Sequence, residues 1–228
     1  MAEKPIWALG AMSGTSLDGV DAAMVLCDGA HILEFGESAY RPYSEAERRV
    51  LRRALGAWQG QPPVAEAEAI IELAHTELLS QFAGAEIVGF HGQTLAHDPA
   101  TGRTHQAGNG QRLAEALDLP VVWDFRSADV EMGGQGAPLA PVFHHAAAMW
   151  AGVEGPVVFL NIGGVANLTL VVPEMPVDQP GALTAFDTGP GNAQIDDLMT
   201  SRTGRRFDKD GAMAIPRGRS PSSSSPRT

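Results

Sequence analysis

Two glycine-rich turns, about 170 residues apart, constrain this chain more than any other feature. The first spans residues 12–21 and the second residues 186–192, and each follows a short apolar run and carries carboxylates. Glycine lets backbone N–H groups approach a phosphate closely. A carboxylate beside such a turn can order Mg²⁺ or take a proton from a nucleophile. The pair therefore predicts a phosphoryl-transfer cleft between two lobes.

Composition narrows the class of protein and its partners. The chain has 228 residues, of which 44% are hydrophobic, which predicts a globular protein of one large or two small domains. Its net charge of −11 argues against nucleic acid or an anionic membrane as the main partner. This acidity does not exclude ATP, because local N–H groups bind its phosphates. Cys27 is the single cysteine, so we expect neither an internal disulfide nor a cysteine zinc site.

The N-terminus has no charged region followed by an apolar run, and no stretch approaches 18 apolar residues. From this pattern we expect a cytoplasmic protein.

Strand and helix patterns alternate along the chain, which predicts an α/β fold. Ser44 and Glu47 form a capping-box pair ahead of one amphipathic helix, and Asn109 is placed to cap another. A third helical stripe consists of Ala67, Ile71, Ala74, Leu78 and Phe82. The expected strands are residues 6–10, 20–26, 31–37, 87–91, 121–124, 157–162, 165–172 and 183–187. Further helices are expected at the residues leading to Met149 and at residues 192–200.

The strand–turn–strand pattern of the opening residues restarts at residue 157, which predicts a second lobe. We therefore expect lobes at residues 1–150 and 151–215. Residues 216–228 hold proline, arginine and serine but no aliphatic or aromatic side chain. Such a segment cannot bury enough surface to order itself, and we interpret it as a disordered, non-native tail.

The first turn offers hydroxyl donors at Thr15 and Ser16 and a carboxylate at Asp18 near the metal or the acceptor. A polar β-turn remains the alternative, because Asp-Gly is a common turn pair. The segment is not a P-loop, since it lacks the Gly-Lys-Ser/Thr sequence.

The other candidate residues each have a structural alternative. His91 ends a buried strand, where ligands gather in α/β folds, but it could equally be a structural histidine. Arg126 can clamp a carboxylate, although a surface ion pair is the common fate of a lone arginine. Asp187 is our candidate general base beside the second turn, with a helix-capping or turn residue as its alternative.

Taken together, the motifs resemble those of the anhydro-N-acetylmuramic acid kinases, sugar kinases of the actin-like ATPase superfamily. They run in family order from about residue 6 to residue 215. The matching stretches are residues 12–21, 91–94, 106–109, 124–126, 133–138, 161–164 and 186–192.

The resemblance implies two ribonuclease-H-like lobes with ATP and sugar between them, Asp187 as the catalytic base, and a substrate site that contains His91, Gln93, Asp124 and Arg126. It also implies ATP with Mg²⁺, a small sugar substrate, a bacterial origin and homodimer formation. The expected product is N-acetylmuramic acid 6-phosphate, an intermediate in recycling peptidoglycan. The implied ATP-binding residues are Gly14, Thr15, Ser16, Leu17, Asp18, Gly19, Val20 and Asp21.

The end of the chain departs from this family, whose members continue well beyond the segment matching residues 208–215. We therefore expect a truncated or frameshifted kinase with an incomplete second lobe. Two alternatives stay open: a related kinase acting on another sugar or a carboxylate, and an inactive fragment that binds ligand.

Overall fold

The computed structural model describes residues 4–214, and the tail expected at residues 216–228 lies outside that range. The described chain divides into two units. The first runs to Val157 and includes Val171–Thr184, and the second comprises Val158–Leu170 and the residues from Ala185. The lobes expected at residues 1–150 and 151–215 stay a prediction, because Val171–Thr184 groups with the earlier part of the chain.

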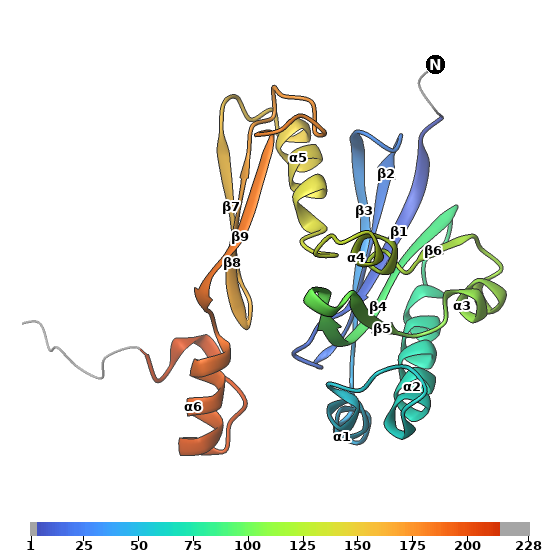
Figure 1. Ribbon diagram of the computed structural model, residues 1–228, viewed down its shortest axis with the longest axis vertical. Coiled ribbons are helices and arrows are strands. Elements are labelled where there is room, and N and C mark those ends of the chain that lie inside the picture. The colour runs from blue at the N-terminus through green and yellow to red at the C-terminus, as the bar shows by residue number, and fades with distance from the viewer. Residues whose placement is uncertain (1–3, 215–228) are drawn as a thin grey trace, which may run out of the picture. The chain divides into compact units, whose positions relative to one another are not determined.

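The described elements alternate between strands and helices, which confirms the α/β class (Figure 1). The strands are β1 Ile6–Ser13, β2 Gly19–Cys27, β3 Ile32–Pro42, β4 Ile87–Asp98, β5 Arg103–Ala107, β6 Val121–Trp123, β7 Val157–Ile162, β8 Val165–Val171 and β9 Leu183–Pro190. The helices are α1 Glu45–Ala54, α2 Pro62–Leu79, α3 Gly110–Leu117, α4 Ser127–Glu131, α5 Ala140–Trp150 and α6 Ala193–Thr203, with 3₁₀ turns at Pro99–Thr101 and Lys209–Gly211.

Six strands form the sheet of the first unit, in the order β3-β2-β1-β4-β5 with β6 also paired to β4. β1, β2 and β3 form an antiparallel meander, and β4 then lies parallel to β1. β5 runs antiparallel to the far part of β4, while β6 runs parallel to its first part. This order and these directions agree with one ribonuclease-H-like lobe, as the sequence led us to expect.

The core of the first unit lies between this sheet and the helices α1 and α2. Each predicted stripe residue is buried, with Ala67, Ile71 and Ala74 fully enclosed. The capping box also forms: Ser44 Oγ accepts a hydrogen bond from the Glu47 N–H, and the Glu47 carboxylate accepts one from the Ser44 N–H. Local sequence signals thus set where α1 begins and which face of α2 is buried.

Two elements were missed by the sequence patterns, and four strands, β1, β3, β4 and β9, end three or more residues later than expected. β5 and α4 carry too few apolar residues to show a period; β5 forms because it pairs with β4, and α4 packs on β5. β9 runs to Pro190, whereas we expected it to end at Asp187. The expectation was wrong because pairing with a neighbouring strand continues through the glycine turn.

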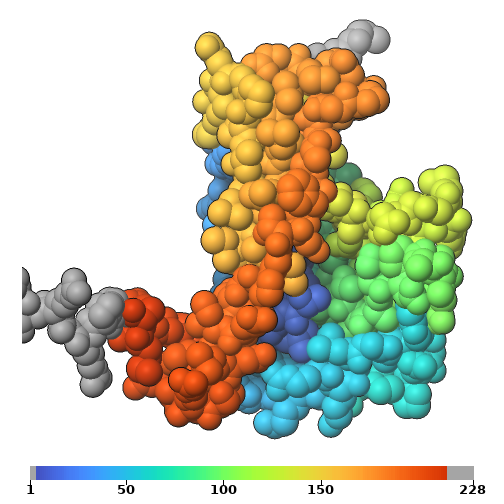
Figure 2. Space-filling view, turned by 60° about the vertical axis from the view of Figure 1, so that its left-hand side comes forward, coloured from blue at the N-terminus to red at the C-terminus, as the bar shows by residue number. Residues whose placement is uncertain are grey.

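The sheet of the second unit has the order β7-β8-β9, and Figure 2 shows part of its surface in yellow and orange. Backbone hydrogen bonds join its two glycine motifs, from the Gly191 N–H to the Gly164 carbonyl (2.9 Å) and from the Asn192 N–H to the Gly163 carbonyl (2.8 Å). A Cβ on Gly191 would lie 2.0 Å from the Gly163 carbonyl oxygen, so this approach requires glycine.

His75 is a fully buried histidine on α2, and it makes the stability of the first unit depend on pH. Its Nδ1 lies 2.7 Å from the Ile71 carbonyl oxygen, its ring packs edge-on against Phe90, and its Nε2 is buried without a hydrogen-bond partner among the described residues. Burial lowers its pKa from 6.5 to about 4. Between these two values the unfolded chain binds more protons than the folded one, so acidification favours unfolding.

We therefore expect the free energy of unfolding to fall by about 2 kcal/mol between pH 7 and pH 5 through His75 alone, at about 1.4 kcal/mol per pH unit below the unfolded pKa. His75→Leu should remove this part of the pH dependence, and the exposed control His97→Gln should keep it. Urea denaturation followed by tryptophan fluorescence measures the first unit specifically, since Trp7, Trp58, Trp123 and Trp150 all lie in it. Equal pH dependence in His75→Leu and the parent chain would contradict this assignment.

Candidate functional site

The first glycine turn connects β1 to β2 and presents two hydroxyl side chains to solvent. The Leu17 N–H donates to the Gly14 carbonyl (3.1 Å), which closes the turn around Thr15 and Ser16. Both hydroxyl residues are exposed, and no hydrogen bond engages their side chains within residues 4–214. The turn therefore offers free hydroxyl donors on a fixed backbone.

Three other residues in this segment pack into the first unit, Leu17 and Val20 through their side chains and Gly19 through its backbone. Leu17 has a positive φ of 58° and is buried, and Val20 is fully buried. Gly19 packs so closely on β3 that a Cβ would lie 2.4 Å from the Arg41 carbonyl oxygen. Of the ATP-binding residues expected here, these three can offer a ligand only their backbone groups. The side chains of Leu17 and Val20 and the close approach of Gly19 to β3 anchor the turn.

Asp18 and Asp21 supply the negative charge of the segment. Burial and repulsion by Asp18 raise the pKa of Asp21. The backbone of Asp18 is fixed from the other side, because its carbonyl accepts hydrogen bonds from the Tyr43 N–H (2.7 Å) and Arg48 Nη2 (3.2 Å). Arg48 is itself buried on α1, so the position of this turn depends on helix packing behind it.

A buried polar chain joins this turn to the β4 motif. Ser13 Oγ donates to Gln93 Oε1 (2.5 Å), and Tyr43 Oη donates to Ser13 Oγ (3.0 Å). Burial raises the pKa of Tyr43, which keeps the phenol protonated as a donor. The Gln93 side chain is 0% exposed, so no ligand can reach it in this structure. The direct substrate contact expected of Gln93 does not fit this burial, and positioning of Ser13 does.

His91 and Arg126 are brought together by the parallel pairing of β4 and β6. Arg126 Nε and Nη2 lie 3.0 and 2.9 Å from His91 Nε2, and Arg126 Nη1 donates to the Gly136 carbonyl (2.8 Å). Because Nε2 accepts from arginine, Nδ1 carries the proton and donates to the Gly92 carbonyl (3.0 Å). Burial, reinforced by the Arg126 charge, lowers the pKa of His91 and keeps the ring neutral.

These hydrogen bonds define what each residue of the pair can do. Both ring nitrogens of His91 are engaged, so His91 orients Arg126 rather than offering its own donor to a sugar hydroxyl. Arg126 keeps N–H groups for a ligand, because its five N–H groups exceed the acceptors that hold it.

Asp124 lies two residues before Arg126 and borders a cavity of about 270 Å³. Its backbone takes the left-handed conformation, with φ 56°, and its Oδ1 accepts a hydrogen bond from the Ser127 N–H (3.3 Å). We call this space the Asp124 cavity. Its other lining residues include Gln106 and Asn109, which belong to one of the motifs singled out in the sequence.

Asp187 lies in the second unit, on β9, and its side chain is exposed. The neighbouring Thr188 Oγ1 donates to the Ala166 carbonyl (3.0 Å), which ties this part of β9 to β8. No hydrogen bond or ion pair engages the Asp187 carboxylate within the described part of the chain. The helix α6 instead has Asn192 at its N-cap, so Asp187 does not cap a helix.

We expect Gln93→Leu to destabilise the first unit by about 1–3 kcal/mol, because Ser13 would lose its buried hydrogen-bond acceptor. Gln111→Leu is a matched control, since Gln111 is exposed on α3 and its side chain donates to Glu115 on the same helix. Urea denaturation with tryptophan fluorescence measures both variants. An effect of Gln93→Leu no larger than that of the control would show that the buried chain does not stabilise the fold.

The chain matches the family model described as anhydro-N-acetylmuramic acid kinase over residues 6–219. It is 66% identical over 210 residues to a curated protein of that name from Cereibacter sphaeroides, and 58% identical over 211 residues to one from Roseobacter denitrificans. Each alignment covers 92% of this chain but only 57% and 56% of the relative. The chain thus spans a little over half the length of these relatives.

A solved Ppx/GppA family member from Aquifex aeolicus is also similar, with a TM-score of 0.44 and 11% identity over 86% of this chain and 55% of that one. This likeness is too weak to bear on function. Among the described residues, no helix is long and apolar enough to cross a membrane. The family-model match covers most of the chain, and the chain belongs to the anhydro-N-acetylmuramic acid kinase family.

Proposed function

We propose that this chain carries the phosphate-binding turn, part of the sugar site and the catalytic base of an anhydro-N-acetylmuramic acid kinase. The single observation that supports this most is family membership together with the retained Asp187, Asp124 and Arg126. The proposed substrates are ATP, water and 1,6-anhydro-N-acetylmuramic acid, and the products are ADP and N-acetylmuramic acid 6-phosphate.

The proposed phosphate site is the turn between β1 and β2. Thr15 and Ser16 would donate to phosphate oxygens, aided by backbone N–H groups of the turn. The buried Ser13–Gln93–Tyr43 chain would hold the turn in place while ATP binds. Preorganised donors of this kind stabilise the charge of a phosphoryl group without reorganising during the reaction.

Asp18 and Asp21 fit a role in holding the Mg²⁺ that accompanies ATP. Burial and, to a smaller extent, repulsion by Asp18 raise the pKa of Asp21, and a cation would relieve the repulsion. Within residues 4–214, no group of three or more histidine, cysteine or acidic side chains forms a metal cage. Mg²⁺ normally takes one or two carboxylates and completes its shell with phosphates and water. When bound, Mg²⁺ would neutralise charge on the transferring phosphoryl group.

The proposed reaction opens the anhydro bridge and phosphorylates O6. Asp187 takes a proton from a water molecule whose oxygen bonds to the anomeric carbon, and the bond from that carbon to O6 breaks. O6 then attacks the γ-phosphorus of ATP, and ADP leaves. A positioned base of this kind contributes roughly 10²–10⁴-fold to the rate. Its exposed, unpaired carboxylate leaves Asp187 free to accept the proton.

The sugar would lie in the Asp124 cavity and contact Asp124 there. Arg126, which lies two residues further along the chain and does not line that cavity, would act as a donor with His91 as its support. A cytoplasmic location and a homodimer belong to the same proposal and rest on the family resemblance. A related kinase for another sugar or a carboxylate, and an inactive ligand-binding fragment, remain the alternatives.

We expect Asp187→Asn to lower sugar-dependent ADP release at least about 100-fold while leaving ATP binding unchanged, because the amide cannot accept the proton of water. Asp197→Asn is a matched control, since Asp197 is an exposed carboxylate on α6 of the same unit. ADP release is measured by a coupled assay with 1,6-anhydro-N-acetylmuramic acid, ATP and Mg²⁺. Near-normal turnover by Asp187→Asn would refute its role as the base.

The same reaction in H₂¹⁸O separates the proposal from its alternatives. One ¹⁸O atom should enter the sugar product at the anomeric hydroxyl, and none should enter the phosphate. A phosphorylated product without ¹⁸O would indicate a kinase that uses a substrate hydroxyl directly. Binding of ATP or sugar without any product would indicate the inactive fragment.

A further inference from the structure

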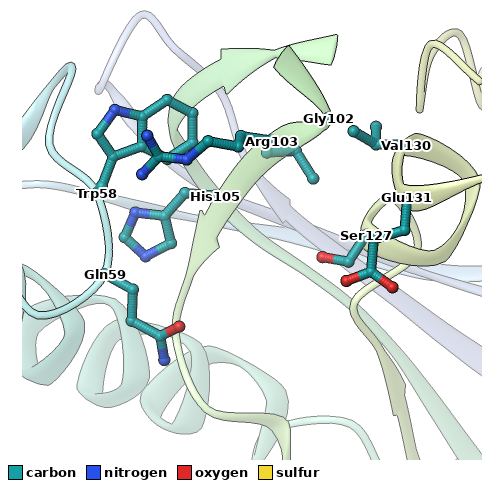
Figure 3. A pocket seen from close by; sticks show the side chains of 9 residues that line it. Trp58, Gln59, Gly102, Arg103, His105, Ser127, Val130 and Glu131 are labelled. Atoms are coloured by element: carbon teal, nitrogen blue, oxygen red, sulfur yellow. The ribbon is translucent and has the colours of Figure 1, made fainter. Parts of the chain in front are cut away.

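A second cavity, of about 230 Å³, continues from the Asp124 cavity along β5. We call it the Trp58 cavity, after the aromatic side chain that forms one of its walls (Figure 3). The two cavities share Gln59, Thr104, His105 and Ser127 as lining residues, so they form one groove. All of these residues belong to the first unit. A ligand in the Asp124 cavity with a side arm could therefore extend into the Trp58 cavity.

Arg103 provides the positive charge of the Trp58 cavity. Its guanidinium lies 3.8 Å from the centre of the Trp58 ring, stacked as Figure 3 shows. No carboxylate pairs with Arg103 among the described residues. Stacking occupies the face of a guanidinium but leaves its N–H groups free at the edge, where they match the two oxygens of a carboxylate. Arg103 is thus held in place by Trp58, while its hydrogen-bonding fork has no partner within residues 4–214.

The other polar groups of the Trp58 cavity determine which way round an anionic ligand binds. His105 Nδ1 lies 2.9 Å from the Ala57 carbonyl and must donate to it, which leaves Nε2 as an acceptor. Ser127 and Glu131 lie on the other side of the cavity from Trp58 and His105 (Figure 3). The Glu131 carboxylate repels an anionic group at that end. A ligand that carries one carboxylate is therefore favoured with the carboxylate at Arg103.

We propose that the Trp58 cavity binds a carboxylate-bearing arm of the substrate, with Arg103 as the residue that selects it. The proposal rests on the proposed function, which places the sugar ring in the Asp124 cavity. A muramic sugar differs from the corresponding glucosamine sugar by a lactyl ether, a short arm that ends in a carboxylate. Arg103 would donate to that carboxylate, and Trp58 would pack against the carbon atoms of the arm. The cavity would thus distinguish muramic from glucosamine substrates.

Isothermal titration calorimetry tests this with two probes, 1,6-anhydro-N-acetylmuramic acid and 1,6-anhydro-N-acetylglucosamine, which lacks the arm. We expect the chain to bind the muramic sugar about tenfold more tightly than the glucosamine sugar, because one charge-assisted hydrogen bond contributes an affinity gain of this size. Arg103→Gln should abolish this preference while leaving the affinity for the glucosamine sugar unchanged. Arg103→Lys should restore part of the preference, because it keeps the charge but lacks the planar fork. Arg53→Gln is a matched control, since it removes one charge at an exposed site on α1 outside both cavities.

The outcomes separate this inference from the proposed function. Equal affinity of the parent chain for both sugars, or a preference that survives in Arg103→Gln, would overturn the role of Arg103 and leave the kinase assignment standing. Binding of neither sugar would overturn the sugar site in this chain and the arm site with it. Circular dichroism and the urea midpoint of each variant, compared with the parent, ensure that only folded proteins are compared.

Discussion

The parallel pairing of β1 with β4 is the interaction on which the rest of the first unit depends. It places the ends of two strands side by side, where ligands gather in α/β sheets. The buried hydrogen bonds of Ser13 with Gln93 and Tyr43 close this junction. Each polar group in this hydrogen-bonded network needs its partner. Leaving a buried polar group without a hydrogen bond costs more free energy of folding than a formed hydrogen bond contributes. The junction therefore fixes the turn between β1 and β2 relative to the β4 motif.

The candidate ligand-binding groups of the first unit lie on two sides of this junction. Toward β2 lies the turn with Thr15, Ser16 and the two carboxylates, held from behind by Arg48 and Tyr43. Toward β5 and β6 lies the groove formed by the Asp124 and Trp58 cavities. Both directions use rigid strand ends with short connections, which is how a scaffold fixes reactive groups within a fraction of an ångström. The second unit contributes Asp187 on a strand whose glycine turns are joined backbone to backbone.

Several features of the fold could be predicted from local patterns. The capping box at Ser44, the cap at Asn109 and the buried stripe of α2 follow from chemistry within a few residues, and all three are confirmed. β5 and the short helix α4 could not be predicted, because their polar sequences take shape only through tertiary contacts, β5 with β4 and α4 with β5. The candidate site residues remain predictions, but the structure changes how two of them can act. Gln93 is enclosed, and His91 has both nitrogens engaged.

The sequence by itself determined the α/β class, the positions of the two glycine turns and the membership of the family. The fold class follows from the periodicity of apolar side chains, the turns from their local residue chemistry, and the family from the order of the motifs. Each of these signals can be read directly along the sequence. Only the tertiary structure decided that Arg126 lies on His91, that Ser13 bonds Gln93, and that Arg103 stacks on Trp58. Each of those pairs joins residues 35 to 80 positions apart. Their contact depends on strand order and register, which no local pattern encodes.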